Sequence, residues 1–210
     1  AKGTGKWTSQ EAMDLGVPVP AIDAAVSARE LSALRAERLQ LAALYPGAPP
    51  ARADRAAALA GLEQAYFAAA WIAYAQGFAQ IAAASREYGF GTGLATVARV
   101  WRAGCIIRAA ILEPIHAAFA ANPALANLLL EPAVAAALAP AVAGLRATVI
   151  DGVSCGVPLP ALSAALAYFD GMRSARLPAN LLQAQRDHFG AHTYERLDRD
   201  GSFHSGWGRE

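Results

Sequence analysis

Residues 66–85, YFAAAWIAYAQGFAQIAAAS, decide the fold of this chain. Alanine and large apolar residues fill the segment and proline is absent, a composition that favours helix over strand. Elsewhere apolar residues recur every three or four positions, as at Leu31, Leu34, Leu41 and Leu44, and no long stretch alternates with a period of two. The sequence therefore predicts an all-α fold, a large helical bundle.

Two segments, 66–85 and 131–150, are apolar enough to raise the question of membrane spans. The first contains two glutamines, the second contains a proline and Arg146, and both rely on alanine, which partitions weakly into lipid. We expect both to be buried helices of a protein that does not associate with membranes.

Composition and charge limit the possible partners. The 210 residues are 55% hydrophobic and 17% charged, enough for one large domain or two small ones with a substantial core. The 18 basic and 17 acidic residues are spread along the chain, so we expect no nucleic-acid partner. Cys105 and Cys155 lack the CxxC spacing of a metal or redox site, and no secretory signal opens the sequence. This predicts two buried thiols, no metal and a cytoplasmic protein.

Glycine and proline divide the chain into helical blocks. Clusters of these residues predict breaks between helices at 16–20, 46–50, 89–93, 122–123 and 156–160.

Two of the breaks resemble each other in sequence. LGVPVPAIDAAVSAREL at 15–31 and CGVPLPALSAALAYFDG at 155–171 share glycine, valine, prolines and alanines at matching positions. An internal duplication is the prediction, because a repeated helical unit packs against its copy. Chance similarity of a short Gly-Pro turn is the alternative.

The first eight residues, AKGTGKWT, contain Lys2 and Lys6, the only lysines in a chain with 16 arginines. Glycines let a backbone approach a ligand closely, and the N–H groups and the Thr4 hydroxyl can donate to phosphate oxygens. The GxxxxGK[ST] spacing of a Walker loop is missing, and an ordinary solvated turn is the alternative. Since a domain is not expected to begin in such a turn, we expect the chain to be a piece of a longer polypeptide.

Polar chemistry is concentrated near the end, in NLLQAQRDHFGAHTYERLDRDGSFHSGW at 180–207. This stretch holds His188, His192 and His204, three of the four histidines, and it is rich in arginine and acidic residues.

Five motifs together resemble the C-terminal all-helical domain of the 6-phosphogluconate dehydrogenase family. They are KGTGKWT at 2–8, SARELSALRAER at 27–38, VWRAGCIIRAAIL at 100–112, YFDGMRSARLPANLLQAQRDHFGAHTYER at 168–196 and FHSGW at 203–207. Members of this family also carry a duplicated helical domain.

The resemblance implies an enzyme of the pentose phosphate pathway that oxidises 6-phosphogluconate with NADP and releases carbon dioxide and ribulose 5-phosphate. It also implies that an N-terminal Rossmann domain, with most of the NADP contacts, and the catalytic lysine and glutamate lie upstream of Ala1. GFGTGLA at 89–95 follows a helical stretch and is expected to be an interhelical loop. We therefore expect no catalytic residue in this chain and no activity from it alone.

Two alternatives remain open. One is another member of the β-hydroxyacid dehydrogenase superfamily, although those relatives generally lack the duplicated half and the QRDHFGAHTYE tail. The other is a non-catalytic helical interaction protein descended from the enzyme.

The resemblance also implies that the chain has two parts with different roles. Residues 1–177 form the all-helical substrate-binding and dimerisation domain, and 178–210 form a C-terminal tail. In the implied homodimer the tail of each subunit packs on its partner and completes the partner's site.

Five substrate-binding residues follow from the matching motifs. Lys2, Thr4 and Arg29 are implied to bind 6-phosphogluconate from one subunit, while Arg186 and His192 reach the site of the neighbouring subunit. Arginine suits a phosphate because it can bind it bidentately.

The other histidines are given structural roles. His116, inside an apolar helix, is expected to be packed and hydrogen-bonded. His188 stands where the family usually has an aromatic residue and is expected to pack. For His204 two roles stay open, a contact with the cofactor or a cap of the tail.

The remaining charged residues are also expected to be structural. Arg102 and Arg108 are placed on one helix containing WRAGCIIR and are expected to form ion pairs. Asp187 and Glu195 are expected to hold the geometry of the tail.

Overall fold

The computed structural model describes residues 3–47 and 54–208. Its elements in chain order are α1 (Thr4–Asp14), α2 (Pro20–Leu31), α3 (Arg35–Leu44), α4 (Arg55–Glu87), α5 (Leu94–Trp101), α6 (Leu112–Ala121), the 3-10 helix η1 (Leu128–Leu130), α7 (Pro132–Ser154), α8 (Pro160–Met172), α9 (Asn180–Gly190), β1 (Tyr194–Glu195) and β2 (Ser202–Phe203). The chain divides into two compact units, which we call the helical unit (Ala1–Phe169) and the tail unit (Asp170–Glu210). The all-α prediction is confirmed.

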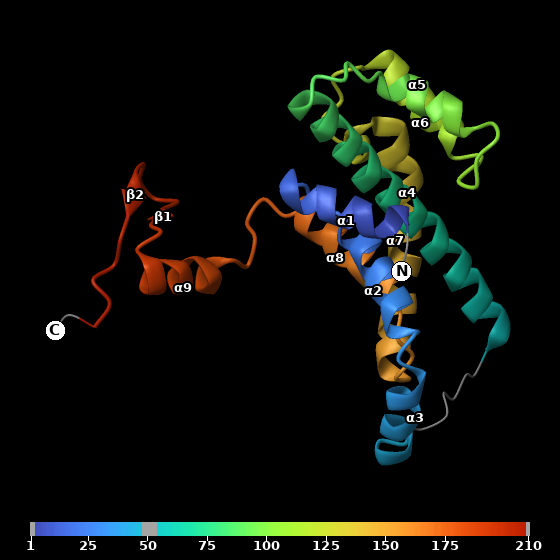
Figure 1. Cartoon of the computed structure of the whole chain (residues 1–210), viewed down its shortest axis with the longest axis horizontal. Coiled ribbons are helices and arrows are strands. Elements are labelled where there is room, and N and C mark those ends of the chain that lie inside the picture. The colour runs from blue at the N-terminus through green and yellow to red at the C-terminus, as the bar shows by residue number, and fades with distance from the viewer. Residues whose placement is uncertain (1–2, 48–53, 209–210) are drawn as a thin grey trace. The chain divides into compact units, whose positions relative to one another are not determined.

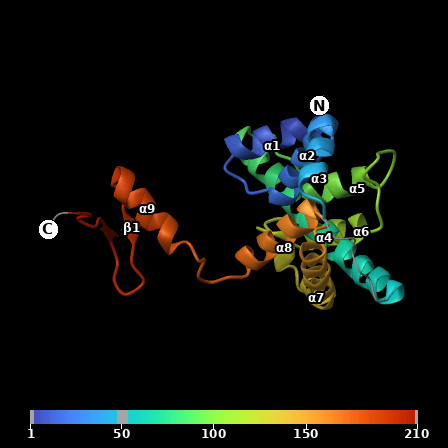
Figure 2. The same cartoon turned by 90° about the horizontal axis from the view of Figure 1, so that it is seen from below.

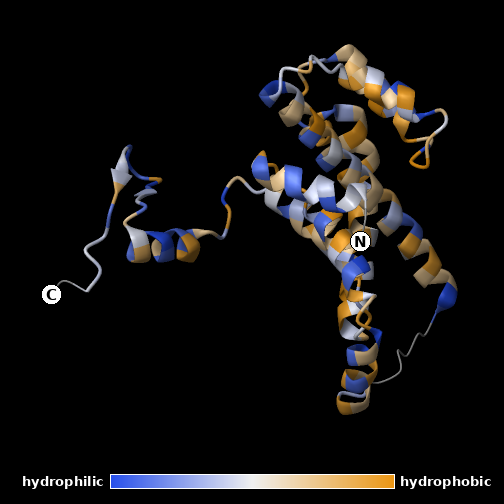
Figure 3. Cartoon of the chain, in the orientation of Figure 1, coloured by the Kyte–Doolittle hydropathy of each residue, from blue (hydrophilic) through white to orange (hydrophobic). Residues whose placement is uncertain are grey.

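The helical unit is built around α4 and α7, which pack along each other, and around the neighbouring pair α5 and α6 (Figure 1). The segment 66–85 lies inside α4. The buried positions Ala65, Ala68, Ile72 and Ala75 recur at helical spacing, so one face of α4 points into the core. Most of α4, α5 and α6 is apolar in Figure 3, as burial against several neighbours requires.

Small residues allow α4 and α7 to approach closely. A Cβ atom added at Gly144 of α7 would overlap the side chain of Gln64 on α4. The glycine is therefore a packing residue at the centre of the unit.

The two glutamines of segment 66–85 attach the first helices to α4. Gln76 is fully buried, and its Oε1 accepts a hydrogen bond from the N–H of Ala21 at 3.1 Å. Gln80 donates from Nε2 to the carbonyl of Thr8 at 2.8 Å. These polar residues in an apolar helix therefore position α1 and α2, the helices that carry the candidate site residues of this unit.

The structure confirms four of the breaks that glycine and proline predicted. They separate α1 from α2, α4 from α5, α6 from η1, and α7 from α8. The break at 46–50 follows the end of α3 at Leu44, and most of it lies outside the described residues.

The helix predicted across WRAGCIIR is wrong. The preceding helix α5 ends at Trp101 and α6 begins only at Leu112. Gly104 lies between them with φ of 78°, a left-handed conformation that a right-handed helix does not contain.

The two copies of the sequence repeat have the same local structure. Gly16 and Gly156 follow the ends of α1 and α7 with φ of 65° and 66°. In each copy the next residue donates its N–H, at 2.8 Å, to a carbonyl five residues earlier, the pattern of a Schellman cap. A proline then starts the following helix in both copies. This shared geometry supports the internal duplication.

One described helix, α7, is long and apolar enough to cross a membrane on the basis of length and composition. About two-fifths of its most apolar stretch, 39%, is buried inside the protein, where α7 packs on α4. Core helices of proteins outside membranes can have the same length and composition.

The tail unit contains α9 and a short antiparallel sheet (Figure 2). Tyr194 pairs with Phe203 and Glu195 pairs with Ser202. The sequence did not predict these strands, because two residues each are too few for a period-two pattern.

Candidate functional site

The predicted N-terminal turn is the beginning of a helix. Lys2 lies outside the described residues, and Thr4 is the first residue of α1, after Gly3 with φ of 150°. The Thr4 side chain is exposed, and its carbonyl accepts a hydrogen bond from the Thr8 hydroxyl at 2.7 Å. An ordinary solvated turn was one alternative for this segment, and from Thr4 onward the chain is helical instead. The first turn of a helix does present unpaired N–H groups, which suit an anion.

Thr4 and Arg29 lie at the same end of the α1–α2 helix pair. A Cβ built on Gly5 would come within 3.1 Å of Cγ2 of Val26, so the first turn of α1 lies against α2. Arg29 is on α2 one turn beyond Val26, exposed, and donates from its guanidinium to the Ser32 hydroxyl at 2.9 Å. The structure thus places Thr4 and Arg29 toward the same end of this helix pair.

Arg186 and His192 lie near the C-terminal end of α9 in the tail unit. Both side chains are exposed. The Arg186 guanidinium is 3.5 Å from Oε1 of Gln183 on the same helix, a weak hydrogen bond that leaves it available to an anion.

The backbone around His192 is unusual. Ala191 and Thr193 flank it with φ of 50° and 62°, the only non-glycine residues with positive φ in the described chain. A β-branched residue rarely adopts this conformation. The preceding residue is Gly190, where a Cβ would come within 2.7 Å of Nε2 of His192. The imidazole therefore lies against the last turn of α9, and a Cβ at position 190 would force the ring to shift.

Asp187 is the centre of the tail unit and its only buried residue among 170–208. Its Oδ1 accepts the N–H of Thr193 at 3.1 Å and lies 2.9 Å from Nδ1 of His204. Its Oδ2 accepts the N–H of Ser205 at 2.9 Å and the indole N–H of Trp207 at 2.8 Å.

These bonds determine the ionisation of the Asp187 carboxyl group. Burial by itself raises its pKa, but the hydrogen bonds from Ser205, His204 and Trp207 outweigh burial and hold the pKa well below the ordinary value of 3.8. Asp187 is therefore a carboxylate at neutral pH, and it can accept bonds from all four donors.

Aromatic contacts complete the unit. The His188 ring meets that of Trp207 edge-on at 5.7 Å, which confirms the packing role of His188. Tyr194 packs on Phe203 at 6.3 Å, and its hydroxyl is hydrogen-bonded to that of Ser205 at 2.8 Å.

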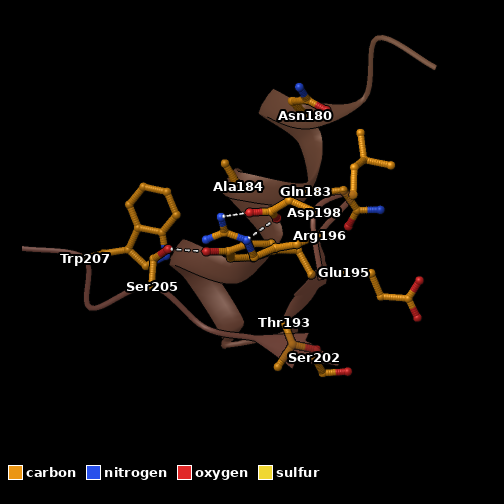
Figure 4. Close-up of a pocket in the computed structure, with 12 residues that line it drawn as sticks. Asn180, Gln183, Ala184, Thr193, Glu195, Arg196, Asp198, Ser202, Ser205 and Trp207 are labelled. Atoms are coloured by element: carbon orange, nitrogen blue, oxygen red, sulfur yellow. Dashed lines mark hydrogen bonds and ion pairs between the residues drawn. The ribbon is translucent and has the colours of Figure 1, made fainter. Parts of the chain in front are cut away.

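A pocket of about 740 Å³ lies between α9 and the short sheet. Figure 4 shows Arg196 and Asp198 paired at its wall. Their two hydrogen bonds measure 2.7 and 2.6 Å, and Ser205 and Trp207 also line the pocket. Neither Arg186 nor His192 is among its lining residues. The two predicted residues thus do not line this pocket.

Two pockets of the helical unit do not include the predicted residues either. The larger, of about 910 Å³, lies between α4, α6 and α7, and the smaller, of about 540 Å³, lies beside α1 and α4. Both are mainly apolar, and Thr4 and Arg29 line neither.

Most of the structural roles assigned to the other polar residues are confirmed. His116 is packed in α6 with Nδ1 2.8 Å from the carbonyl of Ala95, and Arg102 forms an ion pair with Glu113. For His204 the structure shows a bond inside the tail, to Asp187. Arg108 lies in the segment between α5 and α6.

The remaining predictions concern thiols and metals. Cys105 and Cys155 are free thiols and only half-buried, so the prediction that both are buried was wrong. Among the described residues no group of three or more histidine, cysteine, aspartate or glutamate side chains could hold a metal ion.

Sequence reasoning missed the donors that surround Asp187. Ser205 and Trp207 lie 18 and 20 residues further along the chain. One signal in the sequence could have indicated a buried carboxylate. Asp187 is an acidic residue beside Arg186, in a segment with few apolar residues to bury.

The fold and the site define an all-helical domain with a small polar unit that presents exposed cationic and imidazole groups. A sequence model of the 6-phosphogluconate dehydrogenase C-terminal domain matches residues 1–207. A decarboxylating 6-phosphogluconate dehydrogenase of Synechococcus elongatus is 46% identical over 208 residues, and an NADP(+)-dependent one of Bacillus subtilis is 47% identical. The chain therefore belongs to the family of 6-phosphogluconate dehydrogenase C-terminal domains.

A solved structure agrees with this assignment. A 6-phosphogluconate dehydrogenase of Plasmodium falciparum, studied in its apo form and with NADP+ or 6-phosphogluconate, matches with a TM-score of 0.93 and 38% identity over 99% of this chain. The chain spans 45% of that protein and 44% of each of the two bacterial relatives, and 98% of the chain is aligned with them.

Proposed function

We propose that this chain is the substrate-binding part of an NADP-dependent enzyme that converts 6-phosphogluconate to ribulose 5-phosphate and carbon dioxide. The observation that carries the proposal is the identity of 46–47% across 98% of the chain with relatives that bear this activity in their names. NADP accepts the hydride when it is bound. We place the proposed enzyme in the cytoplasm, as a soluble metabolic enzyme.

In this proposal the residues bind the substrate from two places. Lys2, Thr4 and Arg29 hold the substrate, chiefly its phosphate, from the helical domain, which we assign to residues 1–177. The placement of Thr4 and Arg29 toward the same end of the α1–α2 pair supports this role. A phosphate with nearly two negative charges needs several convergent donors, and arginine can supply two at once.

Arg186 and His192 complete the site from the tail, 178–210. Their exposure supports this role, because groups that bind a ligand of another subunit must be accessible outside their own unit. We infer a homodimer in which the tail of each subunit packs on its partner. Light scattering tests this part. A mass near twice 21.8 kDa supports the dimer, whereas a mass of 21.8 kDa with and without 6-phosphogluconate contradicts it.

The reaction also requires a nucleotide-binding part and a catalytic lysine and glutamate, which in our proposal belong to a preceding domain. The chain alone should then form no NADPH. We expect activity from a chimera in which the part of the Bacillus subtilis relative that precedes the matched segment is fused to this chain. An inactive chimera that is folded and binds NADP would contradict the proposal, and so would NADPH formation by the chain alone.

The role of Arg186 can be tested in the same chimera. Arg186→Ala should raise KM for 6-phosphogluconate about 10- to 100-fold, the effect of losing a hydrogen bond to a charged group, while KM for NADP stays within about twofold. Arg176→Ala removes another exposed arginine of the tail unit and is the matched control. Equal increases in both KM values would count against a phosphate contact.

A further inference from the structure

We propose that Asp187 is a positioning residue for His192 and acts by holding the turn that follows α9. The inference rests on the proposed function, in which the imidazole of His192 contacts the substrate. It adds a residue that touches no substrate yet determines where a substrate-binding group lies.

The bonds of Asp187 join three segments of the tail unit. Its carboxylate lies on α9, Thr193 precedes β1, and Ser205 follows β2. Because two of the donors are backbone N–H groups, the carboxylate fixes the main chain at both points and not only side chains. The turn that carries His192 is thus held between the end of α9 and Thr193, whose N–H is bonded to Asp187.

The turn needs such a support. Ala191 and Thr193 both have positive φ, and neither residue type favours this conformation. Strained backbone persists when surrounding contacts over-determine it. The bond from the N–H of Thr193 to Asp187 lies directly after His192 and is such a contact. Without it the turn can relax and move the imidazole away from Gly190.

An ionised carboxylate is the group that this position requires. Each of its oxygens meets two donors, so all four donors point at an acceptor. An asparagine has one acceptor oxygen and an amide that only donates, and it therefore leaves one pair of donors facing an N–H group. Because the site is buried, donors without an acceptor are costly, and we expect the segments that carry them to move out of their present positions.

The first test measures geometry without substrate. In the 210-residue chain we expect NMR contacts between the His192 ring and Gly190, and a hydrogen-bonded indole N–H signal from Trp207. Asp187→Asn should remove both. Asp198→Asn breaks an exposed ion pair of the same unit and should keep both. Persistence of the ring contacts in Asp187→Asn overturns the inference.

The second test asks whether Asp187 acts through His192. Calorimetry of 6-phosphogluconate binding should show a loss of about tenfold for Asp187→Asn, as expected when one hydrogen bond to a charged group is lost. In a His192→Ala background the same change should cost less than about twofold, because the residue to be positioned is gone. An equal loss in both backgrounds would mean general damage to the tail and would overturn the inference.

A milder variant guards against unfolding of the tail. Trp207→Phe removes one of the two donors to Oδ2 and keeps the carboxylate and the aromatic packing. We expect Trp207→Phe to weaken binding of 6-phosphogluconate by two- to threefold. In the His192→Ala background this loss should disappear. A loss that persists there overturns the inference. If His192→Ala alone leaves binding unchanged, His192 does not bind the substrate and that part of the proposed function is wrong. The NMR contacts between the His192 ring and Gly190 then still test whether Asp187 positions His192.

Discussion

The helical unit and the tail unit are stabilised in different ways. The helical unit buries apolar side chains from α4, α6, α7 and α8 in one continuous core. The tail unit, about forty residues long, buries no apolar side chain among 170–208 and encloses one carboxylate instead. A segment of that size cannot form a sufficient apolar core, so a fully satisfied polar centre takes its place. Stability is therefore spread over many residues in one unit and concentrated at Asp187 in the other.

The largest expected effect on stability is in the core of the helical unit. Leu145 of α7 is fully buried. Leu145→Ala should lower the free energy of unfolding by about 2–5 kcal/mol, because it removes buried methyl groups and leaves a cavity. Urea denaturation followed by circular dichroism measures it. The indole N–H signal of Trp207 should keep its position in the folded variant, since the tail unit has its own centre.

Leu44→Ala is the matched control, because that side chain is 71% exposed. It should change the free energy of unfolding by about 0.5 kcal/mol or less. Equal losses for the two variants would show that the apolar core is not the main source of stability.

A smaller effect is expected at the duplicated turns. Gly16→Ala and Gly156→Ala each place a Cβ in the left-handed region and should each cost about 1–2 kcal/mol. Nearly equal losses are the prediction, because the two caps have the same geometry. Gly77→Ala, inside α4 with open space around it, should instead stabilise the protein by about 0.5–1 kcal/mol.

Acid should affect the tail unit more than the helical unit. The pKa of Asp187 is lowered by folding, so its contribution is complete above the unfolded-state value near 3.8 and decreases as the pH falls below it toward the folded-state pKa. We expect the hydrogen-bonded signal of the Trp207 indole to remain from pH 7 to pH 4 and to weaken only as the pH falls further toward the folded-state pKa. Asp187→Asn should lack this transition, and its presence in that variant would contradict the assignment.

The smallest effect concerns a surface ion pair. Arg102 and Glu113 are each about half exposed, so Glu113→Gln should cost less than about 1 kcal/mol. A thermal melt in low and in 0.5 M salt measures it. A larger loss would mean that the segment between α5 and α6 depends on this pair.

The sequence predicted the helical unit better than the tail unit, for physical reasons. Segment 66–85 and the Gly-Pro clusters carry local signals for helices and their ends, and these predictions were confirmed. The predicted helix across WRAGCIIR, 101–108, was wrong. Gly104 does not by itself rule out a helix in the sequence, but in the structure it has positive φ. The geometry-holding role of Asp187 was predicted, but its four donors were not, since only the tertiary fold brings them together.

Binding of the substrate by this chain tests the account most directly. Calorimetric titrations with 6-phosphogluconate and with gluconate compare the same sugar acid with and without its phosphate. The phosphate is the group that Arg29 and Arg186 are proposed to bind. We predict saturable binding of 6-phosphogluconate, at least tenfold weaker binding of gluconate, and a smaller difference between the two ligands in Arg186→Ala. Equal affinities for the two ligands, or no binding of 6-phosphogluconate, would contradict the claim that this chain holds the substrate through its phosphate.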